Sequence, residues 1–490
     1  MEKFDLIVIG SGAAGLTSAF TALGFGKKVL IVEKHKSGGE CTWSGCIPSK
    51  GLINEAKAVH TARKFAEFKV DTAAILARVR AISESIYQHE TPEVLEQAGA
   101  IFVTGPAIFE SAKIITVNER RFQGKKIMIA TGSSPLVPPI PGLDTVPYLT
   151  NDNFFEQQAL PESMVVLGGG AIGMELSQAM NRLGVDVTVV EMMPEVMFRE
   201  EPEFSAIVRQ TLAAEGVKFL LGAKATLFEN CEAGVRVHAE KDQKNIVIEA
   251  RSLLVALGRS PNIDGLNLAA AGIEINKGIK VDERLQTTAK GVYACGDVAG
   301  PYLLSHMANF QGKIATMNAL FPLRRKVNYE HVAWATFTDP EFARAGLTEA
   351  EAKEQHGDSI RVYHYDFDKL DRAKTKQGDM GRIKLITNRK GKVLGAHIIG
   401  ERAGELIAEV QVVKTLGLNF AKLQGVIHPY PTYSDALRQI AQQVFLDNLL
   451  NHPVVRFFRS FSNFSIFFRK NRQKIGSDPL PPRIPGTEVD

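Results

Sequence analysis

Cysteine is scarce in this sequence, and long apolar runs are missing from it. Only four of the 490 residues are cysteine, which suits a reducing compartment. No run approaches the ~18 apolar residues that mark a membrane-spanning helix. The first apolar run begins at Phe4, which leaves no space for a signal peptide. We therefore expect a globular, cytoplasmic protein.

An excess of charge is also missing from most of the chain. Residues 451–490 hold seven of the 58 Lys and Arg and three of the 54 Asp and Glu, so the preceding residues balance at 51 against 51. The whole net charge of +4 therefore lies in this tail. We expect no nucleic-acid partner. A chain of 490 residues is too long for one core and should divide into three or four domains.

A dinucleotide-binding fingerprint opens the chain. The apolar residues 4–9 predict a buried parallel strand, and Gly10-x-Gly12-x-x-Gly15 follows it. These glycines allow a tight turn and a close approach of the backbone to a pyrophosphate at a helix N-terminus. The next apolar run ends at Glu33, which is placed to accept hydrogen bonds from ribose hydroxyls.

The same fingerprint occurs a second time. Each of its residues has a counterpart 158 positions later: Gly168, Gly170, Gly173 and Glu191. Two complete units imply two dinucleotide sites, one for FAD and one for a nicotinamide cofactor. The alternative is a duplicated domain that kept its glycines without a second cofactor.

The end of the second unit indicates which nicotinamide cofactor binds. Glu191 can accept hydrogen bonds from a free ribose 2′-OH and repels a 2′-phosphate. Met192 and Met193 follow it, and the next cation is Arg199. NAD(H) is therefore favoured over NADP(H), unless Arg199 swings toward the ribose.

Two closely spaced cysteines follow the first fingerprint. Cys41 and Cys46 lie in residues 38–50, Gly-Gly-Glu-Cys-Thr-Trp-Ser-Gly-Cys-Ile-Pro-Ser-Lys. A disulfide that closes so small a ring is easier to reduce than a structural one. The alternative, half of a metal clamp, needs two more ligands, and Cys231 and Cys295 are isolated. The segment resembles the redox-active disulfide region of the pyridine nucleotide–disulfide oxidoreductases, which include dihydrolipoamide dehydrogenase, glutathione reductase and mercuric reductase.

The resemblance covers about residues 1–445 and implies an α/β fold. It implies two Rossmann-like dinucleotide-binding domains, for FAD and NAD, and an α+β C-terminal dimerisation domain, so we expect a homodimer. The expected order is residues 1–150 for the first part of the FAD domain with the dithiol, 151–272 for the NAD(H) domain, 273–325 for the second part of the FAD domain, 326–450 for the dimerisation domain, and 451–490 for a basic, Phe-rich, amphipathic tail.

The resemblance also assigns contacts of FAD and NAD(H). Residues 127–133 look like the point where the chain leaves the first FAD segment, and residues 255–262 like a second crossing near both cofactors. Residues 292–297 look like the return to FAD. The expected contacts are Gly10, Gly12, Ala14, Gly15, Glu33, Lys34, Gly39, Cys41, Lys50, Ala107, Thr131, Gly132, Ser133, Gly168, Gly170, Ile172, Gly173, Glu191, Gly258, Arg259, Asp297 and Ser305.

Two charges are expected beside the flavin. In the family, a lysine and a glutamate meet near the flavin N5 and the nicotinamide, where the ammonium stabilises the charge of the reduced flavin. Lys50 and Glu175 hold the corresponding places, although each alone is equally typical of a solvated helix. The resemblance further implies that Cys46 forms a charge-transfer thiolate with the flavin and that Cys41 attacks or binds the acceptor.

The sequence departs from the family at the acid–base site. The family pattern is His-x-His-Pro-Thr-x-Ser-Glu, in which the second His reaches across the dimer to the thiols and the Glu orients it. Here Tyr430 replaces that His and Asp435 the Glu, while His428 keeps an imidazole nearby. A histidine of pKa ~6.5 can protonate sulfur near neutral pH, whereas a phenol of pKa ~10 mostly cannot.

This departure points to one branch of the family. Mercuric reductases also carry Tyr at this place, but they use a C-terminal cysteine pair that residues 486–490 lack. The sequence therefore predicts a mercuric reductase-like enzyme that passes electrons from NADH to a small-molecule or metal-ion acceptor, without mercury-delivery cysteines and without a resident metal. The alternatives are a dihydrolipoyl dehydrogenase with His428 as base and a membrane-associated NADH:quinone enzyme.

The tail has an amphipathic pattern of its own. Phe457, Phe461, Phe464 and Phe468 fall on one helical face, and cations such as Lys470 on the other. We expect either a helix packed on its own dimer or a peripheral helix on an anionic membrane surface.

Overall fold

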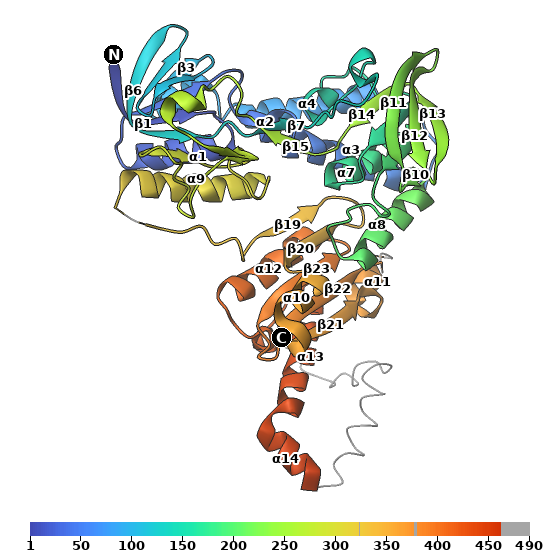
Figure 1. The fold of residues 1–490 in the computed structure, drawn as a ribbon. Coiled ribbons are helices and arrows are strands. Elements are labelled where there is room, and N and C mark those ends of the chain that lie inside the picture. Colours follow the sequence, from blue (N-terminus) through green and yellow to red (C-terminus); the bar gives the residue numbers. More distant parts are fainter. Residues whose placement is uncertain (323, 377–379, 462–490) are drawn as a thin grey trace, which may run out of the picture.

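Parallel strands that begin at the N-terminus build the first sheet. A computed structural model describes residues 1–322, 324–376 and 380–461 (Figure 1). The strand order is β3-β2-β1-β6-β5-β4, and β18 also pairs with β6. β4 and β5 extend one edge with antiparallel pairs, and the other strands pair in parallel. The strands are β1 (Glu2–Ile9), β2 (Val29–Glu33), β3 (Ile101–Thr104), β4 (Ile108–Ser111), β5 (Ile114–Val117), β6 (Arg120–Ile129) and β18 (Val292–Ala294).

Both faces of this sheet are buried. Leu6 and Val8 of β1 pack with α1 (Ala13–Gly24) and α9 (Ser305–Leu320), which lie side by side along one face (Figure 1). Ile7 belongs to a second hydrophobic cluster on the opposite face. Because alternate residues meet different cores, β1 reads as a continuous apolar run rather than an alternating one.

The second unit repeats this plan on a smaller scale. Its parallel sheet has the order β10-β9-β8-β14, and an antiparallel β-meander follows β10 in the chain. The elements are β8 (Ser163–Leu167), α7 (Ala171–Arg182), β9 (Asp186–Glu191), α8 (Pro202–Glu215), β10 (Lys218–Leu221), β11 (Lys224–Cys231), β12 (Gly234–Lys241), β13 (Lys244–Ala250) and β14 (Ser252–Val255).

Helices and a two-stranded ribbon join the two units. The helix that begins at Cys46 packs against α7 of the second unit. The ribbon pairs β7 with β15 where the chain crosses between the sheets. The connecting elements are α2 (Gly39–Trp43), α3 (Cys46–Ala62), α4 (Thr72–Tyr87), α5 (Pro92–Gln97), β7 (Ser133–Pro135), α6 (Asn151–Phe154), β15 (Arg259–Pro261), β16 (Ile275–Asn276) and β17 (Gly278–Ile279).

The C-terminal domain has a five-stranded antiparallel sheet in the order β19-β20-β23-β22-β21. Helices α12 and α13 bury their apolar residues in its core. The elements are β19 (Ala333–Thr336), β20 (Phe342–Gly346), α10 (Glu349–His356), β21 (Ile360–Asp366), α11 (Asp371–Thr375), β22 (Arg382–Asn388), β23 (Val393–Ile399), α12 (Ala403–Thr415), α13 (Asp435–Asn451) and α14 (Pro453–Phe461). Two Rossmann-like units and an α+β domain confirm the predicted fold class, while the exact domain limits remain predictions.

Charged contacts hold the segment after β9 against the C-terminal sheet. Trp334 Nε1 donates a hydrogen bond to Glu200 at 2.8 Å, and the Arg344 guanidinium lies 3.3 Å from the same carboxylate. Lys384 Nζ lies 2.8 Å from Glu201, and both side chains are buried. The second unit and the C-terminal domain are therefore joined by buried ion pairs.

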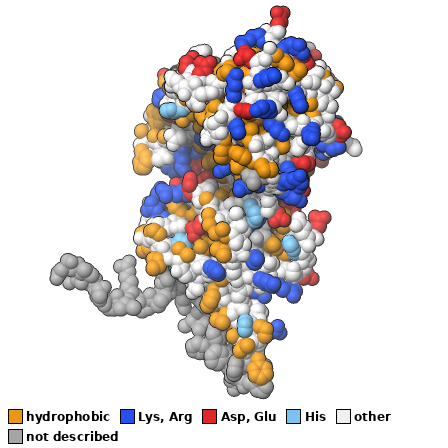
Figure 2. Space-filling model, turned by 90° about the vertical axis from the view of Figure 1, so that its left-hand side faces the viewer, with side chains coloured by type: hydrophobic (Ala, Val, Ile, Leu, Met, Phe, Trp, Pro, Cys, Tyr) orange, Lys and Arg blue, Asp and Glu red, His pale blue; other side chains and the backbone are white. Residues whose placement is uncertain are grey.

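Hydrophobic side chains gather at the lower end of the molecule, over α13 and α14 (Figure 2). Val454 and Phe457 are 54% and 60% exposed there. Phe464, Phe468 and Lys470 of the predicted stripe lie outside the described residues. No described helix is long and apolar enough to cross a membrane.

Candidate active site

One large cavity runs between the two units and the C-terminal domain. Its volume is about 2270 Å³, and its lining extends from the Gly10 turn past the cysteines to Glu191. The predicted site residues all line it except Gly15, Gly173, His428, Tyr430 and Asp435.

The two fingerprint turns have the same backbone geometry. Gly10 has a φ of +99°, and a Cβ there would lie 2.3 Å from the carbonyl oxygen of Ala130. Gly168 has a φ of +106°, and its Cβ would lie 2.5 Å from the oxygen of Ala256. Only glycine adopts this conformation beside a neighbouring backbone without strain. Both turns thus open toward the cavity with bare backbone, as a pyrophosphate requires.

The third glycine of each fingerprint packs against its own turn, and its predicted contact with a cofactor stays a prediction. A Cβ on Gly15 would lie 1.9 Å from the oxygen of Gly10, and one on Gly173 would lie 2.1 Å from the oxygen of Gly168. These glycines let the helix pack directly behind the turn, so they shape the site without lining it.

The acidic residue that ends each unit is held in the same way. Glu33 accepts hydrogen bonds from the Ser11 and His35 amides at 2.8 and 3.0 Å. Glu191 accepts from the Gly169 and Met193 amides at 2.5 and 2.7 Å. Each carboxylate is therefore fixed at the cavity wall beside its own turn, as the predicted contact with a ribose requires.

The cysteines lie on two consecutive helices and face each other. Both are free thiols, Cys41 in α2 and Cys46 at the first position of α3. A hydrogen bond from the Cys41 thiol, a contact with the Ser305 hydroxyl at 3.5 Å and the nearby Lys50 charge lower the pKa of Cys46 to about 5. Donation of that hydrogen bond and burial raise the pKa of Cys41. The pair therefore holds one thiolate, at Cys46, and one thiol at neutral pH.

The structure brings Lys50 and Glu175 together across the gap between the two units. Lys50 Nζ lies 2.8 Å from Glu175 Oε2, and the Phe337 amide donates to the other carboxylate oxygen at 2.8 Å. The ammonium also lies 4.6 Å from the centre of the Phe337 ring. One cation is thus fixed beside the Cys46 thiolate, in the place from which it can stabilise developing negative charge.

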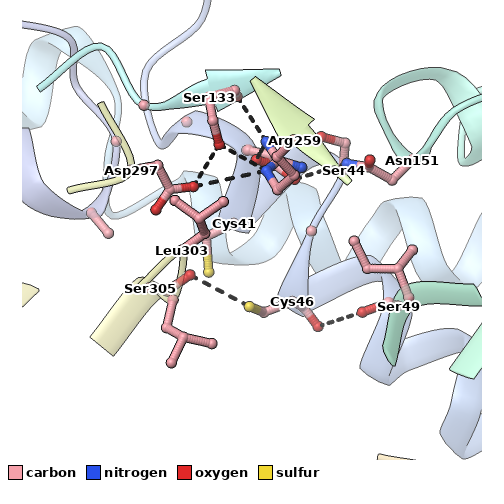
Figure 3. A pocket seen from close by; sticks show the side chains of 18 of the residues that line it. Cys41, Ser44, Cys46, Ser49, Ser133, Asn151, Arg259, Asp297, Leu303 and Ser305 are labelled. Atoms are coloured by element: carbon pink, nitrogen blue, oxygen red, sulfur yellow. Dashed lines mark hydrogen bonds and ion pairs between the residues drawn. The ribbon is translucent and has the colours of Figure 1, made fainter. Parts of the chain in front are cut away.

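A polar cluster beside the thiols contains a residue that the sequence analysis missed. Arg259 forms a bidentate ion pair with Glu40, and its Nε donates to the Ser133 hydroxyl at 2.7 Å. That hydroxyl donates to Asp297 at 2.6 Å (Figure 3). Burial raises the pKa of Glu40 to about 7, and the Arg259 charge opposes the shift. Glu40 gave no signal in the sequence beyond its place next to Cys41.

The C-terminal candidates do not assemble into an acid–base pair within the described protomer. The Tyr430 hydroxyl donates to Asp371 at 2.6 Å, whereas Asp435 accepts from Arg438 and Gln439 at 2.6 and 3.2 Å. His428 has other partners. Its Nδ1 donates to the Val426 carbonyl at 3.0 Å, and its Nε2 lies 2.9 Å from Glu409.

Metal ligands do not cluster in the part of the chain that the structure describes, where no group of three or more His, Cys, Asp or Glu side chains could hold an ion. Cys295 is fully buried directly after β18. Cys231 ends β11 in the second unit.

Sequence comparison identifies the family. The profile "Pyridine nucleotide-disulphide oxidoreductase" matches residues 4–318, and the profile for the dimerisation domain of the same family matches residues 332–441. The chain belongs to the pyridine nucleotide-disulphide oxidoreductases. The predicted recognition is therefore confirmed, and the protein is a flavoprotein enzyme.

Known relatives in this family carry different activities. The chain is 33% identical to a mercuric reductase of Lysinibacillus sphaericus, over 90% of this chain and 82% of the relative. It is 35% identical to a dihydrolipoyl dehydrogenase of Thermus scotoductus, over 90% and 97%. Among solved structures, the Cu(II) complex of the HOCl-induced flavoprotein disulfide reductase RclA from Escherichia coli aligns with a TM-score of 0.82 at 27% identity, over 91% of this chain and 100% of that one.

Family membership establishes the cofactor classes. A pyridine nucleotide-disulphide oxidoreductase uses FAD and a nicotinamide dinucleotide, as predicted. The two glycine turns, each with a carboxylate fixed beside it, fit two dinucleotides in one cavity. The dimerisation domain supports the predicted homodimer. The roles of individual site residues remain predictions.

Proposed function

We propose that the protein is an NADH-dependent flavoprotein reductase that delivers electrons through Cys41 and Cys46 to a thiophilic metal ion. The observation that carries the proposal is the setting of Cys46, whose sulfur lies 3.5 Å from the Ser305 hydroxyl and near the Lys50–Glu175 pair, in contacts that lower its pKa while Cys41 keeps its proton. A thiolate is the form of cysteine that binds soft metal ions, and it is available here at neutral pH.

The residues around the cysteines support this route. FAD, when bound, accepts the hydride of NADH and passes on two electrons. Lys50, held by Glu175, stabilises negative charge beside Cys46. Cys46 contributes a thiolate and Cys41 a thiol. NADH leaves as NAD⁺ with one proton, so its two electrons reduce one Hg(II) to the metal or two Cu(II) to Cu(I).

The residue at the acid–base place favours a metal ion over a thiol substrate. Dithiol–disulfide exchange must move a proton on and off sulfur near neutral pH, and Tyr430 offers a phenol for that task. Reduction of a metal ion requires no proton transfer to the acceptor. Mercuric reductases among the relatives and the Cu(II) complex of RclA agree with this choice.

Anaerobic NADH oxidation tests the proposal when Hg(II), Cu(II), a small disulfide and a quinone are offered in turn. We expect Hg(II) or Cu(II) to be reduced by the wild type and not by Cys41→Ala, while a quinone accepts electrons from both proteins. Reduction of the metal ions at equal rates by the two proteins would remove the dithiol from the route.

Dihydrolipoyl dehydrogenase activity is the second candidate, because relatives with that activity reach 35% identity over almost their whole length. His428 would then have to leave Glu409 and serve as the base. If the wild type oxidises dihydrolipoamide with NAD⁺ faster than it reduces any metal ion, and His428→Ala abolishes this, the second candidate replaces the first.

Peripheral membrane contact is a separate proposal for residues 451–490. The exposed Val454 and Phe457 and the positive charge of this segment support it. Co-sedimentation with anionic and neutral liposomes tests it. The full chain should bind the anionic ones more strongly, and a chain ending at residue 450 should bind neither. Loss of the dimer in the shortened chain would instead show that the segment packs on its own protein.

A further inference from the structure

A half-buried ion pair beside the dithiol has no role in the route described above. Glu40 directly precedes Cys41, and both of its carboxylate oxygens accept hydrogen bonds from the guanidinium of Arg259, with 2.6 Å between Oε1 and Nη1. The amide nitrogen of Asn151 also donates to Oε1, at 2.7 Å. The Arg259 side chain is only 10% exposed. A bidentate pair this well enclosed is strong and directional.

The remaining donors of Arg259 extend this pair toward the opposite wall of the cavity. Its Nε and Nη2 donate to the hydroxyl and the carbonyl of Ser133, both at 2.7 Å. Ser133 in turn donates to Asp297 at 2.6 Å. In Figure 3, the contacts among Arg259, Ser133 and Asp297 lie above the two sulfur atoms. Arg259 is thus committed to protein partners on both sides and is not directed at a cofactor phosphate.

The helix that carries Cys41 depends on such contacts. α2 has only five residues, and Gly38 at its start offers no side-chain cap. A helix this short has little stability of its own. Its end is also tightly packed, because a Cβ on Gly45 would lie 2.9 Å from the Glu40 carbonyl oxygen and 3.1 Å from the Cys41 Cα. The contacts of Glu40 therefore help to set the position of Cys41, together with the hydrogen bond from Thr42 to Glu90 at 2.8 Å.

We propose that Glu40 and Arg259 are positioning residues that hold Cys41 where it can bond to Cys46, and that they thereby set the thiol–disulfide equilibrium of the pair. The inference rests on the proposed redox role of the dithiol. When the pair is broken, α2 loosens and the two sulfurs meet less often. The unpaired Arg259 cation also stabilises the Cys46 thiolate. Both effects favour the dithiol over the disulfide.

The experiment is a redox titration of the intact, flavin-loaded enzyme in mixtures of reduced and oxidised dithiothreitol. Reduced dithiothreitol supplies two electrons and two protons to the disulfide and becomes a cyclic disulfide itself. The fraction of Cys41 and Cys46 present as thiols is read from the mass added by alkylation. The variants are Glu40→Gln, which keeps the shape and removes the charge, and Glu40→Asp, which keeps the charge on a shorter arm.

A matched control lies on α3, the helix that carries Cys46. Glu55 forms a bidentate pair with Arg78, with oxygen–nitrogen distances of 2.6 and 3.0 Å, on the outer surface. Glu55→Gln makes the same chemical change without touching α2. Thermal unfolding of every variant records any general loss of stability.

We expect Glu40→Gln to shift the exchange equilibrium toward the dithiol by about tenfold, or about 30 mV for two electrons. Glu40→Asp should shift it less in the same direction, and Glu55→Gln should leave it unchanged. An unchanged equilibrium in both Glu40 variants, or an equal shift in Glu55→Gln, overturns the inference while the proposed function stands. If the wild type forms no Cys41–Cys46 disulfide in any mixture, the proposed function itself fails.

Discussion

The first and second dinucleotide units share the geometry of their turns and differ in what covers them. Gly39, from the segment that leads into the dithiol, approaches the first turn so closely that a Cβ on it would lie 2.6 Å from the Gly12 Cα. At the second turn, a Cβ on Gly170 would meet nothing within 4 Å. The first site is therefore closed by its own chain, and the second is open.

The difference matches what each cofactor must do. FAD stays with the enzyme through many turnovers, so a site covered by α2 suits it. NADH must enter and NAD⁺ must leave, so an open turn suits the second site. The fingerprint fixes only the turn and the acidic residue, while the segment after the acidic residue covers the turn in the first unit and leaves it open in the second.

The test with the largest expected effect removes the thiolate, which only the first unit carries. Cys46→Ser should abolish electron transfer to the metal ion while FAD stays bound and is still reduced by NADH. After anaerobic addition of two electron equivalents, the wild type should show long-wavelength absorbance from the Cys46 thiolate beside oxidised FAD. Because the pKa of Cys46 is lowered to about 5, this absorbance should persist at neutral pH and fade as the pH falls through about 5.

The same spectra tell whether this account is wrong. A wild type without the long-wavelength absorbance, whose two thiols are alkylated freely even in the oxidised enzyme, would contradict the redox assignment of the pair. Cys231→Ser serves as the control, because Cys231 lies on β11, away from the cavity.

The second test restores the histidine that the family carries at the position of Tyr430. Tyr430→His combined with Asp435→Glu restores the family pattern, and positioned acid–base catalysis is typically worth about 10²–10⁴-fold. Dihydrolipoamide turnover should rise by about that factor, while quinone turnover stays nearly constant. If the wild type already oxidises dihydrolipoamide rapidly and His428→Ala changes nothing, Tyr430 is not the limiting feature.

The third test makes the same substitution in each unit and compares its effects on FAD retention and on the KM for NADH. Alanine at Gly15 or Gly173 collides with the carbonyl of the turn, and overpacking of this kind costs about 1–3 kcal/mol. Gly173→Ala should raise the KM for NADH by about 10–100-fold with FAD retained, whereas Gly15→Ala should release FAD. Gly24→Ala, in α1 with open space around it, is the control. Equal loss of FAD in both variants would show that the units are not independent.

The smallest expected effect concerns the ribose. Glu191→Ala removes a carboxylate that we expect to accept hydrogen bonds from the NADH ribose, which weakens NADH binding by about 1–2 kcal/mol. A further Met192→Arg should then improve NADPH. Glu33→Ala, the equivalent change in the first unit, should affect FAD retention and not the choice of nicotinamide. A wild type with a higher kcat/KM for NADPH would contradict the role of Glu191.

The sequence predicted those parts of the site that depend on backbone geometry. A constant offset of 158 residues predicted two equivalent turns, because only glycine fits where Gly10 and Gly168 meet a neighbouring carbonyl. Lys50 and Glu175 were also brought together as the family resemblance implied. The first result required no knowledge of how the units pack, whereas the second came from the family, whose fold brings the two units together.

Contacts between distant side chains that the family resemblance did not imply were beyond the reach of the sequence. Glu40 has no motif that pairs it with Arg259, since the two are 219 residues apart and meet only where the domains cross. Asp435 was expected to orient Tyr430. In the described protomer it instead forms an ion pair with Arg438, which lies one helical turn away. Phe464 and Phe468 of the predicted Phe stripe lie outside the described residues.

The ion pairs between the second unit and the C-terminal sheet limit how this enzyme can be re-engineered. The nicotinamide-binding module joins the first unit through short crossings of the chain, so it could be exchanged for that of another protein with few changes to the backbone. However, Trp334, Arg344 and Lys384 would lose Glu200 and Glu201, and only Glu351 and Glu349 of their own domain would remain to pair with Arg344 and Lys384. A chimera that keeps these buried contacts must therefore transplant strands β19, β20 and β22 together with the module.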